Sequence, residues 1–258
     1  MLLTTPGLVL RAVNYKEADK ILTILTRDYG KRTVKARGCR RKTSKLTAAA
    51  QLLVWSDMTL YQRGEFLTLN EAEVLEQFLP LRQDIVLLAA ASYFAEVAEA
   101  AAQEGEPAGD LLSLVLNSLY ALSALKKPPE LVKAAFELRL LCLTGYEPLL
   151  DACAVCGRPD PVRPRLNLTQ GVLHCAGCRQ EVGDGVSMPL TDGALAAARH
   201  IALGDPKKLF SFRLDGEGLR SLGEMTEAFL MTQQERGFRT LDYYKKITRM
   251  PGVKEKKG

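Results

Sequence analysis

Four cysteines in the second half of the chain stand in two closely spaced pairs. Two residues separate Cys153 from Cys156, two separate Cys175 from Cys178, and 18 residues lie between the pairs. Two intervening residues let one tight turn bring two sulfurs to within about 3.8 Å of each other, as a tetrahedral zinc ion requires. The spacing therefore predicts one Zn²⁺ held by all four cysteines in a small zinc-ribbon module over residues 148–189.

Four thiolates would fill the coordination shell of zinc, which indicates a structural rather than a catalytic metal. A redox pair, an iron–sulfur cluster and unrelated thiols are the alternatives. His174 could replace one cysteine as a ligand, although a surface histidine is the simpler interpretation. Cys142 lies among leucines and is expected to be buried. Cys39 lies between Arg37 and Arg40, whose charges should lower the pKa of its thiol and make it reactive.

The second group of residues with a clear chemistry is cationic. The first 80 residues hold 13 Lys and Arg against 8 Asp and Glu, which accounts for the whole formal net charge of +5. Such focused positive charge predicts a docking face for a polyanion, most commonly the phosphate backbone of a nucleic acid. A solvated loop, an acidic protein and a membrane surface are the alternatives. The candidate phosphate-binding residues are Arg27, Lys31, Arg32, Lys35, Arg37, Arg40, Arg41, Lys42 and Lys45.

Exposed aromatic side chains on such a surface can stack on bases without distinguishing their sequence. Tyr29, at the tip of a predicted turn, is the best stacking candidate. Tyr61 and Phe66 fit the core equally well, and for Trp55 a core position is favoured. No helix carries the pattern of a duplex-recognition helix, so sequence-specific binding in a major groove is the weaker model.

The segment that positions these residues is rich in β-branched and aromatic residues and is punctuated by turns containing Gly30 and Gly64. We expect five short strands, over 8–15, 20–26, 31–37, 52–62 and 65–73, with room for a short helix in 42–51. A flat sheet of this size would leave two unprotected edges, so a small closed or partly open barrel is predicted.

After Pro80 the apolar spacing becomes helical. We expect helices over 81–103, 111–125, 130–144, 192–203 and 218–236, which a helical bundle accommodates most simply. Asp110 is expected to cap the second helix and Gly145 to end the third. The predicted domains are a barrel at 1–79, helices at 80–147 and 190–241 around the cysteine module, and a basic, disordered tail at 242–258.

Motifs of common enzymes are missing. There is no phosphate-binding loop of the Walker type, no nucleophile elbow and no zinc-protease motif, and two histidines are few for acid–base chemistry. These observations favour a binding protein over an enzyme. The N-terminus lacks the features of a signal peptide and no apolar run is long enough to span a membrane, so the chain is expected in the cytoplasm.

The chain also resembles a known family. Residues 7–46 are similar to the N-terminus of the RecO DNA-repair proteins: Glu17 and Asp19 follow the first strand, a hairpin ends at Gly30, and Ala36-Arg37-Gly38 precedes the basic run Arg40-Arg41-Lys42. Residues 145–178 are similar to the family's zinc segment, with the four cysteines in place. The resemblance extends from about residue 7 to 236 with the parts in order, and the Lys-rich tail matches nothing in the pattern.

The resemblance implies an N-terminal OB-fold, a helical domain and a zinc-binding module in a bacterial protein that acts at the nucleoid. It implies binding of single- and double-stranded DNA, annealing of complementary strands, and loading of RecA onto DNA coated by single-strand-binding protein (SSB), together with RecR. The implied partners are DNA, RecR, the C-terminal tail of SSB and, indirectly, RecA. A zinc-ribbon transcription or translation factor and a hydrolase of nucleic acids are the alternatives.

Overall fold

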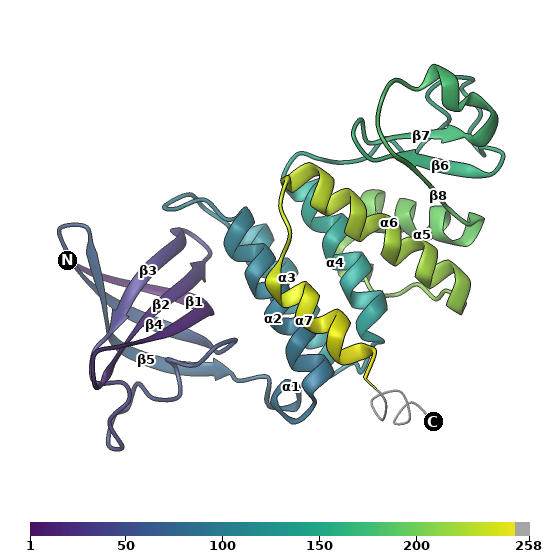
Figure 1. Ribbon diagram of the computed structural model, residues 1–258. Coiled ribbons are helices and arrows are strands. Elements are labelled where there is room, and N and C mark those ends of the chain that lie inside the picture. Colours follow the sequence, from purple (N-terminus) through teal and green to yellow (C-terminus); the bar gives the residue numbers. More distant parts are fainter. Residues whose placement is uncertain (251–258) are drawn as a thin grey trace. The chain divides into compact units, whose positions relative to one another are not determined.

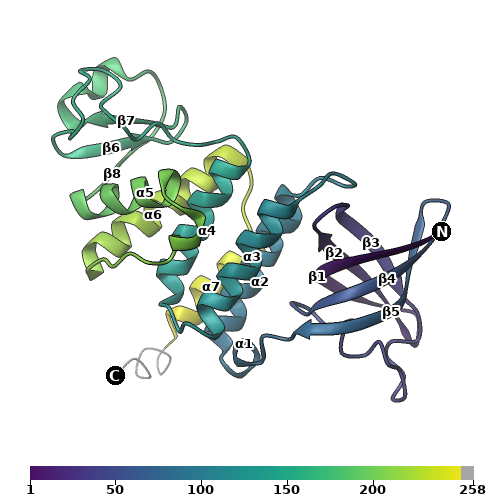
Figure 2. The same cartoon turned by 180° about the vertical axis from the view of Figure 1, so that it is seen from behind.

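The computed structural model describes residues 1–250, which fold into two compact units (Figure 1; Figure 2 shows the reverse side). The first, called here the barrel unit, contains Met1–Leu125 and the segment that begins at Phe238. The second, the cysteine unit, contains Lys126–Gly237. The helices expected to form one domain are therefore divided between the barrel unit and the cysteine unit.

A closed five-stranded barrel forms the N-terminal part of the barrel unit. Its strands are β1 (Leu2–Tyr15), β2 (Asp19–Thr26), β3 (Gly30–Ala36), β4 (Trp55–Arg63) and β5 (Phe66–Glu76). They close in the order β1-β2-β3-β5-β4, with β3 and β5 parallel and the other pairs antiparallel. This is the Greek-key closure of an OB-like barrel, and it confirms the predicted fold class.

The interior of the barrel follows from the two-residue periodicity of its strands. Leu22 and Ile24 of β2, Val34 of β3, and Met58 and Leu60 of β4 are buried in one apolar cluster. Each such side chain contributes roughly 1.5–3 kcal/mol by leaving water. The residues between them point outward. On β2 this outward face is covered, since Thr23 is 4% exposed and donates to Glu99 of a later helix, whereas Thr59 of β4 is partly exposed.

Glycines make the two tight turns of the barrel possible. Gly30 and Gly64 have φ angles of +57° and +61°, in the left-handed region that other residues rarely adopt. At Gly30 there is also no space for a side chain, because a Cβ atom would collide with the backbone carbonyl oxygens of Gln103 and Glu106. The turn between β2 and β3 therefore requires glycine twice over, for its φ angle and for its close approach to another loop.

Residues 37–54, between β3 and β4, form consecutive turns, and the short helix considered for 42–51 is absent from this segment. Backbone bonds from Arg41 to Gly38 and from Ser44 to Arg41, both 3.0 Å, close successive turns. The hydroxyl of Thr47 donates to the carbonyls of Cys39 and Ser44. Such side-chain bonds compete with helix formation for the same carbonyl groups.

Helices complete the barrel unit: α1 (Leu79–Gln83), α2 (Ile85–Ala101), α3 (Gly109–Ser123) and α7 (Arg239–Thr248). The single helix expected over 81–103 is divided at Asp84, whose carboxylate accepts the N–H groups of Val86 and Leu87 and thereby starts α2. Asp110 does not cap α3; it lies in the first turn, two residues after the cap at Ala108.

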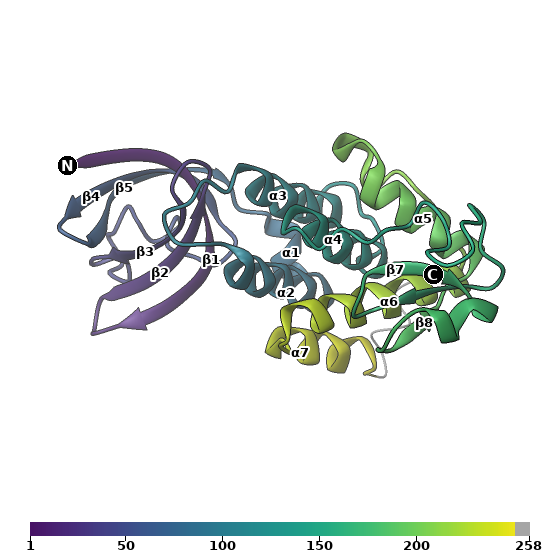
Figure 3. The ribbon, with the colours of Figure 1, turned by 90° about the horizontal axis from the view of Figure 1, so that it is seen from above.

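The prediction of a disordered tail from residue 242 is wrong for residues 242–248, which lie in α7, while residues 251–258 are outside the described part of the chain. Leu241, Tyr244 and Ile247 bury one side of α7, and α7 packs along α2 (Figure 3). The carboxylate of Glu96 on α2 accepts the backbone N–H of Thr240 at 2.9 Å, close to the start of α7. The charge pattern of the tail hid this apolar spacing.

The cysteine unit contains α4 (Pro129–Leu143), α5 (Asp192–Leu203) and α6 (Gly216–Gln234), two 3₁₀ turns η1 (Ala176–Glu181) and η2 (Pro206–Lys208), and a sheet ordered β7-β6-β8. Its strands are β6 (Pro164–Asn167), β7 (Val172–Cys175) and β8 (Ser187–Pro189). Gly145 ends α4 as expected, with a φ angle of +88° and a bond from the N–H of Tyr146 to the carbonyl of Leu141. Nowhere in residues 1–250 is a helix both long and apolar enough to cross a membrane.

A buried ionic cluster joins α4 to α6. The ammonium group of Lys133 lies 2.9 Å from the carboxylate of Glu137 and 3.0 Å from that of Glu227. The hydroxyl of Thr226 donates to the other oxygen of Glu137 at 2.8 Å. Burial opposes the charged form of Lys133, but the two carboxylates outweigh it and raise the pKa. The cluster is satisfied internally, so it serves the packing of the unit.

Candidate nucleic-acid interface and metal centre

The four cysteines predicted to bind metal converge in the cysteine unit. Their sulfur atoms all lie within 4.8 Å of one another, and those of Cys156 and Cys175 are 3.8 Å apart. The latter distance is the sulfur–sulfur separation of about 3.8 Å in a tetrahedral zinc–thiolate site. Cys153 and Cys156 come from the loop after α4, Cys175 ends β7, and Cys178 lies in η1. The four residues can therefore hold one metal ion.

Backbone bonds fix the loop that carries the first pair. The N–H of Ala154 donates to the carbonyl of Leu173 on β7 at 2.8 Å, and the N–H of Gly157 donates to that of Cys153 at 2.9 Å. Gly157 has a φ angle of +69°, which suits the sharp turn after the pair. Because β7 also carries Cys175, the bond from Ala154 to Leu173 holds the first cysteine pair beside the second without the help of a metal ion.

The electrostatics of the cluster favour a bound cation. Burial opposes ionisation of Cys153, but N–H groups of Cys156, Cys175 and Val155 point at its sulfur and lower the pKa to about 6. Burial, together with the neighbouring sulfurs of Cys156 and Cys153, raises the pKa of Cys178 to about 12. One thiolate forms easily and the next is opposed by its negative charge, an opposition that a bound cation would relieve.

His174 is not the surface residue that was expected. It is fully buried, its Nδ1 lies 2.8 Å from the carbonyl of Cys175, and its Nε2 lies 2.9 Å from the hydroxyl of Ser187. Because a carbonyl only accepts, Nδ1 is the donor in the first bond. Both ring nitrogens are engaged away from the sulfurs, so His174 braces β7 against β8 and does not replace a cysteine in the cluster.

The two remaining cysteines also differ from expectation. Cys39 is 2% exposed, and burial raises the pKa of its thiol, so the neighbouring basic residues do not activate it. Their charged groups extend into solvent while the sulfur faces the barrel core. Cys142 is only partly buried, yet burial still raises the pKa of its thiol to about 11.

The residues predicted to contact nucleic acid, Lys35 excepted, separate into two groups. The first, called the turn group, lies at or beside the β2–β3 turn and contains Arg27, Tyr29, Lys31 and Arg32. The second, called the loop group, belongs to the turns after β3 and contains Arg37, Arg40, Arg41, Lys42 and Lys45. Lys35 belongs to neither group: its ammonium lies 3.0 Å from the carboxylate of Asp19.

The turn group is packed against the connection between α2 and α3. The carbonyl of Arg27 accepts the N–H of Ala108 at 2.9 Å, and the N–H of Lys31 donates to the carbonyl of Gln103 at 3.2 Å. The ammonium of Lys31 donates to the carbonyl of Glu99, on α2, at 2.9 Å. The same connection carries Glu104 and Glu106, both exposed. Their negative charge reduces the positive potential around the turn group, although within residues 1–250 neither carboxylate forms an ion pair with Arg27 or Arg32.

The loop group is open to solvent. All five of its cations are exposed, and within residues 1–250 the side chains of four, Arg37, Arg41, Lys42 and Lys45, make no hydrogen bond or ion pair. The exception is Arg40, whose guanidinium donates to the carbonyls of Lys16 and Glu17 at 3.2 and 3.0 Å. The loop group therefore presents four exposed cations that have no internal partner in the part of the chain that the structure describes.

A network around Asp19 anchors the start of this loop. The carboxylate of Asp19 accepts the N–H of Gly38 at 2.8 Å, and the N–H of Arg40 donates to the carbonyl of Ala18 at 3.0 Å. The bond from Gly38 and the neighbouring ammonium of Lys35 hold the pKa of Asp19 below its usual 3.8. The loop group consequently starts from a fixed backbone, even though within residues 1–250 four of its five side chains make no hydrogen bond or ion pair.

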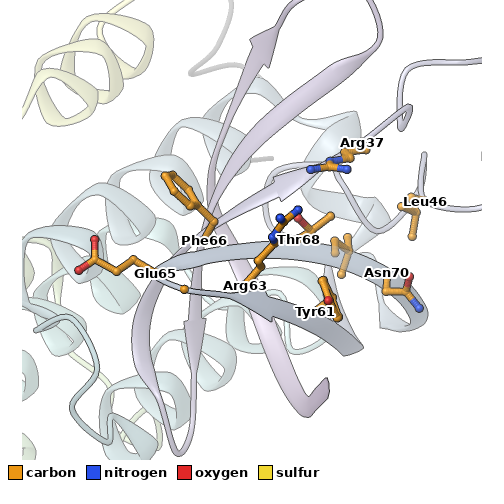
Figure 4. A pocket seen from close by; sticks show the side chains of 10 residues that line it. Arg37, Leu46, Tyr61, Arg63, Glu65, Phe66, Thr68 and Asn70 are labelled. Atoms are coloured by element: carbon orange, nitrogen blue, oxygen red, sulfur yellow. The ribbon is translucent and has the colours of Figure 1, made fainter. Parts of the chain in front are cut away.

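Beside the loop group, an open groove of about 800 Å³ runs along the outside of β4 and β5 (Figure 4). Its lining includes Arg37, Tyr61, Arg63, Phe66, Thr68 and Asn70. Tyr61 and Phe66 are 47% and 81% exposed, so they are surface residues. Trp55 is half-buried, with its indole nitrogen shielded from solvent. The sequence had not singled out Arg63, Thr68 or Asn70, although the two-residue alternation around Tyr61 and Arg63 already places them outside the barrel.

Comparison with known proteins agrees with this architecture. Residues 1–78 match the family model described as "Recombination protein O N terminal", and residues 82–242 match "Recombination protein O C terminal". The two matched ranges adjoin near α1, where the barrel gives way to helices.

Curated relatives match over almost their whole length. A protein of Acetivibrio thermocellus named "DNA repair protein RecO" is 32% identical over 248 residues, which cover 96% of this chain and 98% of that protein. Proteins of the same name from Symbiobacterium thermophilum and Heliobacterium modesticaldum are 32% and 34% identical, over 92% and 94% of this chain and 94% and 89% of their own lengths. With both halves matched in order, this chain belongs to the RecO family of DNA repair proteins.

Proposed function

We propose that this protein is a recombination mediator without catalytic activity. It binds single- and double-stranded DNA without sequence preference, anneals complementary strands, and acts with RecR to load RecA onto SSB-coated DNA at the bacterial nucleoid. Membership of the RecO family supports the role in DNA repair. The observation that carries the proposal is the exposed loop group, whose unpaired cations lie on a rigid barrel.

The proposed division of labour follows the fold. The barrel, residues 1–79, contacts the DNA backbone through the loop group, because cations that have no internal partner can each neutralise a phosphate and release a counterion. The helices over 80–147 and 190–241 provide docking surfaces for RecR and the SSB tail. The cysteine module at 148–189 supports the later helices.

We further propose that the metal is a single structural Zn²⁺. The four sulfurs, the 3.8 Å separation of Cys156 and Cys175 and the N–H groups aimed at Cys153 support zinc in a closed site. Zinc there would offset half of the thiolate charge and join the loop after α4 to β7 and η1. We expect purified protein to contain one zinc per chain, and Cys175→Ser to release it and lower the melting temperature of the chain. Protein that is stable and metal-free after purification without chelator would contradict this.

The test of the DNA-binding role uses labelled oligonucleotides of random sequence, single-stranded and duplex, over a salt series, with annealing of complementary strands followed in the same samples. We expect binding to both forms that weakens steeply between about 50 and 200 mM salt. We also expect faster annealing with intact strands. Absence of binding at low salt, or a strong preference for one sequence, would overturn the proposal.

A further inference from the structure

Two aromatic side chains, one from each strand, lie on the outer face of the β4–β5 hairpin. Tyr61 is opposite Thr68 in the antiparallel register, and Arg63 is opposite Phe66. Residues two apart on a strand share a face, so all four side chains point outward and Tyr61 and Phe66 are diagonal neighbours. Figure 4 shows Arg63 between the two rings. The antiparallel pairing of β4 with β5 fixes this arrangement, because it continues along both strands from the pair Trp55 and Glu76 to the pair Arg63 and Phe66.

Both rings are left largely in water, and Phe66 is the most exposed large apolar side chain on the strands of the barrel. Phe66 is 81% exposed and Tyr61 47%, whereas the alternate residues Leu60 and Leu67 are buried. A single exposed apolar side chain is ordinary, but two on one face beside a groove are what a binding surface requires. Because their backbone is held in the barrel, the rings would lose little conformational freedom when a ligand covers them.

The surroundings of the rings show what kind of ligand fits. Arg37 of the loop group and Arg63 border the groove, and within residues 1–250 neither forms a side-chain hydrogen bond or ion pair. Thr68 and Asn70 add a hydroxyl and an amide to the lining, and Glu65 at the hairpin tip is its one carboxylate. Aromatic faces interspersed with guanidinium groups match a nucleotide chain, which alternates flat bases with phosphates.

We propose that this groove is a stacking site for unpaired bases, with Tyr61 and Phe66 as the stacking residues and Arg37 and Arg63 as the contacts to the flanking phosphates. The inference rests on the proposed function, since it assumes that the barrel binds DNA, and it adds a discriminating element. In a duplex the faces of the bases are covered by their neighbours, so only a single strand can use the rings.

Such a site also suits the annealing of strands. Stacking occupies the face of a base and leaves its hydrogen-bonding edge open to solvent. A strand held on Tyr61 and Phe66 would therefore remain able to pair with a complementary strand. Once pairing began, the bases would stack on each other and leave the rings. The groove would hold the single strand more tightly than the annealed product, which favours release.

The experiment compares the wild-type protein with the double variant Tyr61→Ala, Phe66→Ala. Three probes of equal length are used: a single strand of random sequence, an abasic single strand and a duplex. Base–aromatic stacking contributes about 1–3 kcal/mol per base, so we expect the variant to bind the normal single strand at least about tenfold more weakly. Binding to the abasic strand and the duplex should change less than about twofold, with an unchanged salt slope.

Tyr120→Ala is the matched control, because Tyr120 lies on α3 and is 53% exposed, similar to Tyr61. Phe66→Leu provides a second variant, which keeps apolar bulk without an aromatic face and should weaken binding of the normal strand. Phe66→Trp keeps an aromatic face and should retain the wild-type affinity for that strand. Circular dichroism and the melting temperature establish that each variant is folded.

The outcomes separate the two proposals. If the wild-type protein binds no probe, the proposed function fails. If it binds all three and the double variant, or Phe66→Leu, retains full affinity for the normal strand, the stacking site is wrong while the function stands. Equal losses on normal, abasic and duplex probes would also overturn it. The stacking site would also be wrong if the groove bound an acidic, apolar peptide while the double variant bound the single strand as tightly as the wild-type protein does.

Discussion

The turn group and the loop group have similar composition but opposite surroundings. Both are short basic segments, adjacent in the sequence and joined by β3. The turn group lies against a connection that carries Glu104 and Glu106, and Lys31 uses its charge to bond a backbone carbonyl. The loop group faces solvent, with four of its five cations unpaired within residues 1–250.

This difference shows that a high density of cations in a sequence locates a basic region, but does not identify which of those cations are free to contact phosphate. A cation contributes to binding phosphate only where its field is not cancelled by a nearby carboxylate. On that basis we propose the loop group, together with the groove at Tyr61 and Phe66, as the binding face. The turn group instead helps to hold the barrel against α2 and α3.

The largest expected effect comes from neutralising the loop group. We expect Arg41→Gln, Lys42→Gln and Lys45→Gln, made together, to weaken binding of single-stranded DNA on the order of 30-fold at low salt. The slope of affinity against salt should fall by about 2, because each lost phosphate contact removes about 0.7 for single strands. Fluorescence anisotropy across a salt series measures both quantities.

The turn group supplies the matched control. Arg27→Gln with Arg32→Gln removes cations of the same type from the same barrel, and we expect less than about a threefold change in affinity, with an unchanged salt slope. Similar losses in the two variants would mean that the acidic connection does not cancel the charge of the turn group, and the comparison would be broken.

Local patterns made much of this fold predictable. Alternating apolar residues and two turn glycines indicated five strands, and the cysteine spacing predicted which four sulfurs would meet. These features depend on neighbours within a few residues. The same alternation could have shown that Tyr61 faces outward, since Ser56, Met58 and Leu60 occupy the buried positions of β4.

Features that depend on distant contacts could not be predicted. Nothing near Arg27 shows that residues some eighty positions later carry the opposing carboxylates. Likewise α7 forms where its apolar side packs on α2 and Glu96 accepts the N–H of Thr240, a contact across 144 positions. Cys39 was misjudged for the same reason: charged neighbours in sequence say little about a sulfur that points into the barrel core.

A smaller effect should follow from removing the acids beside the turn group. Glu104→Gln with Glu106→Gln should raise the affinity for single-stranded DNA about threefold at low salt, because the cations of the turn group would then act on phosphate. The gain should vanish near 1 M salt, where the Debye length is about 3 Å. Combining this variant with Arg27→Gln and Arg32→Gln should abolish the gain at all salt concentrations, and a gain that persists would come from another source.

The smallest effect concerns the anchor of the loop group. The pKa of Asp19 is lowered by the N–H of Gly38 and by Lys35, so its carboxylate is charged throughout the neutral range. A lowered folded-state pKa means that the stabilisation is complete above pH 3.8 and is lost only as the pH falls through the lower, folded-state value. The protection factor of the Gly38 amide against hydrogen exchange should therefore stay constant from about pH 8 down to about pH 4 and then decline. Asp19→Ala should lower it several-fold at neutral pH, whereas Asp28→Ala in the β2–β3 turn should leave it unchanged. Loss of protection already at about pH 6 in the wild-type protein would show that another group holds the loop, and the fixed backbone of the loop group would need a different explanation.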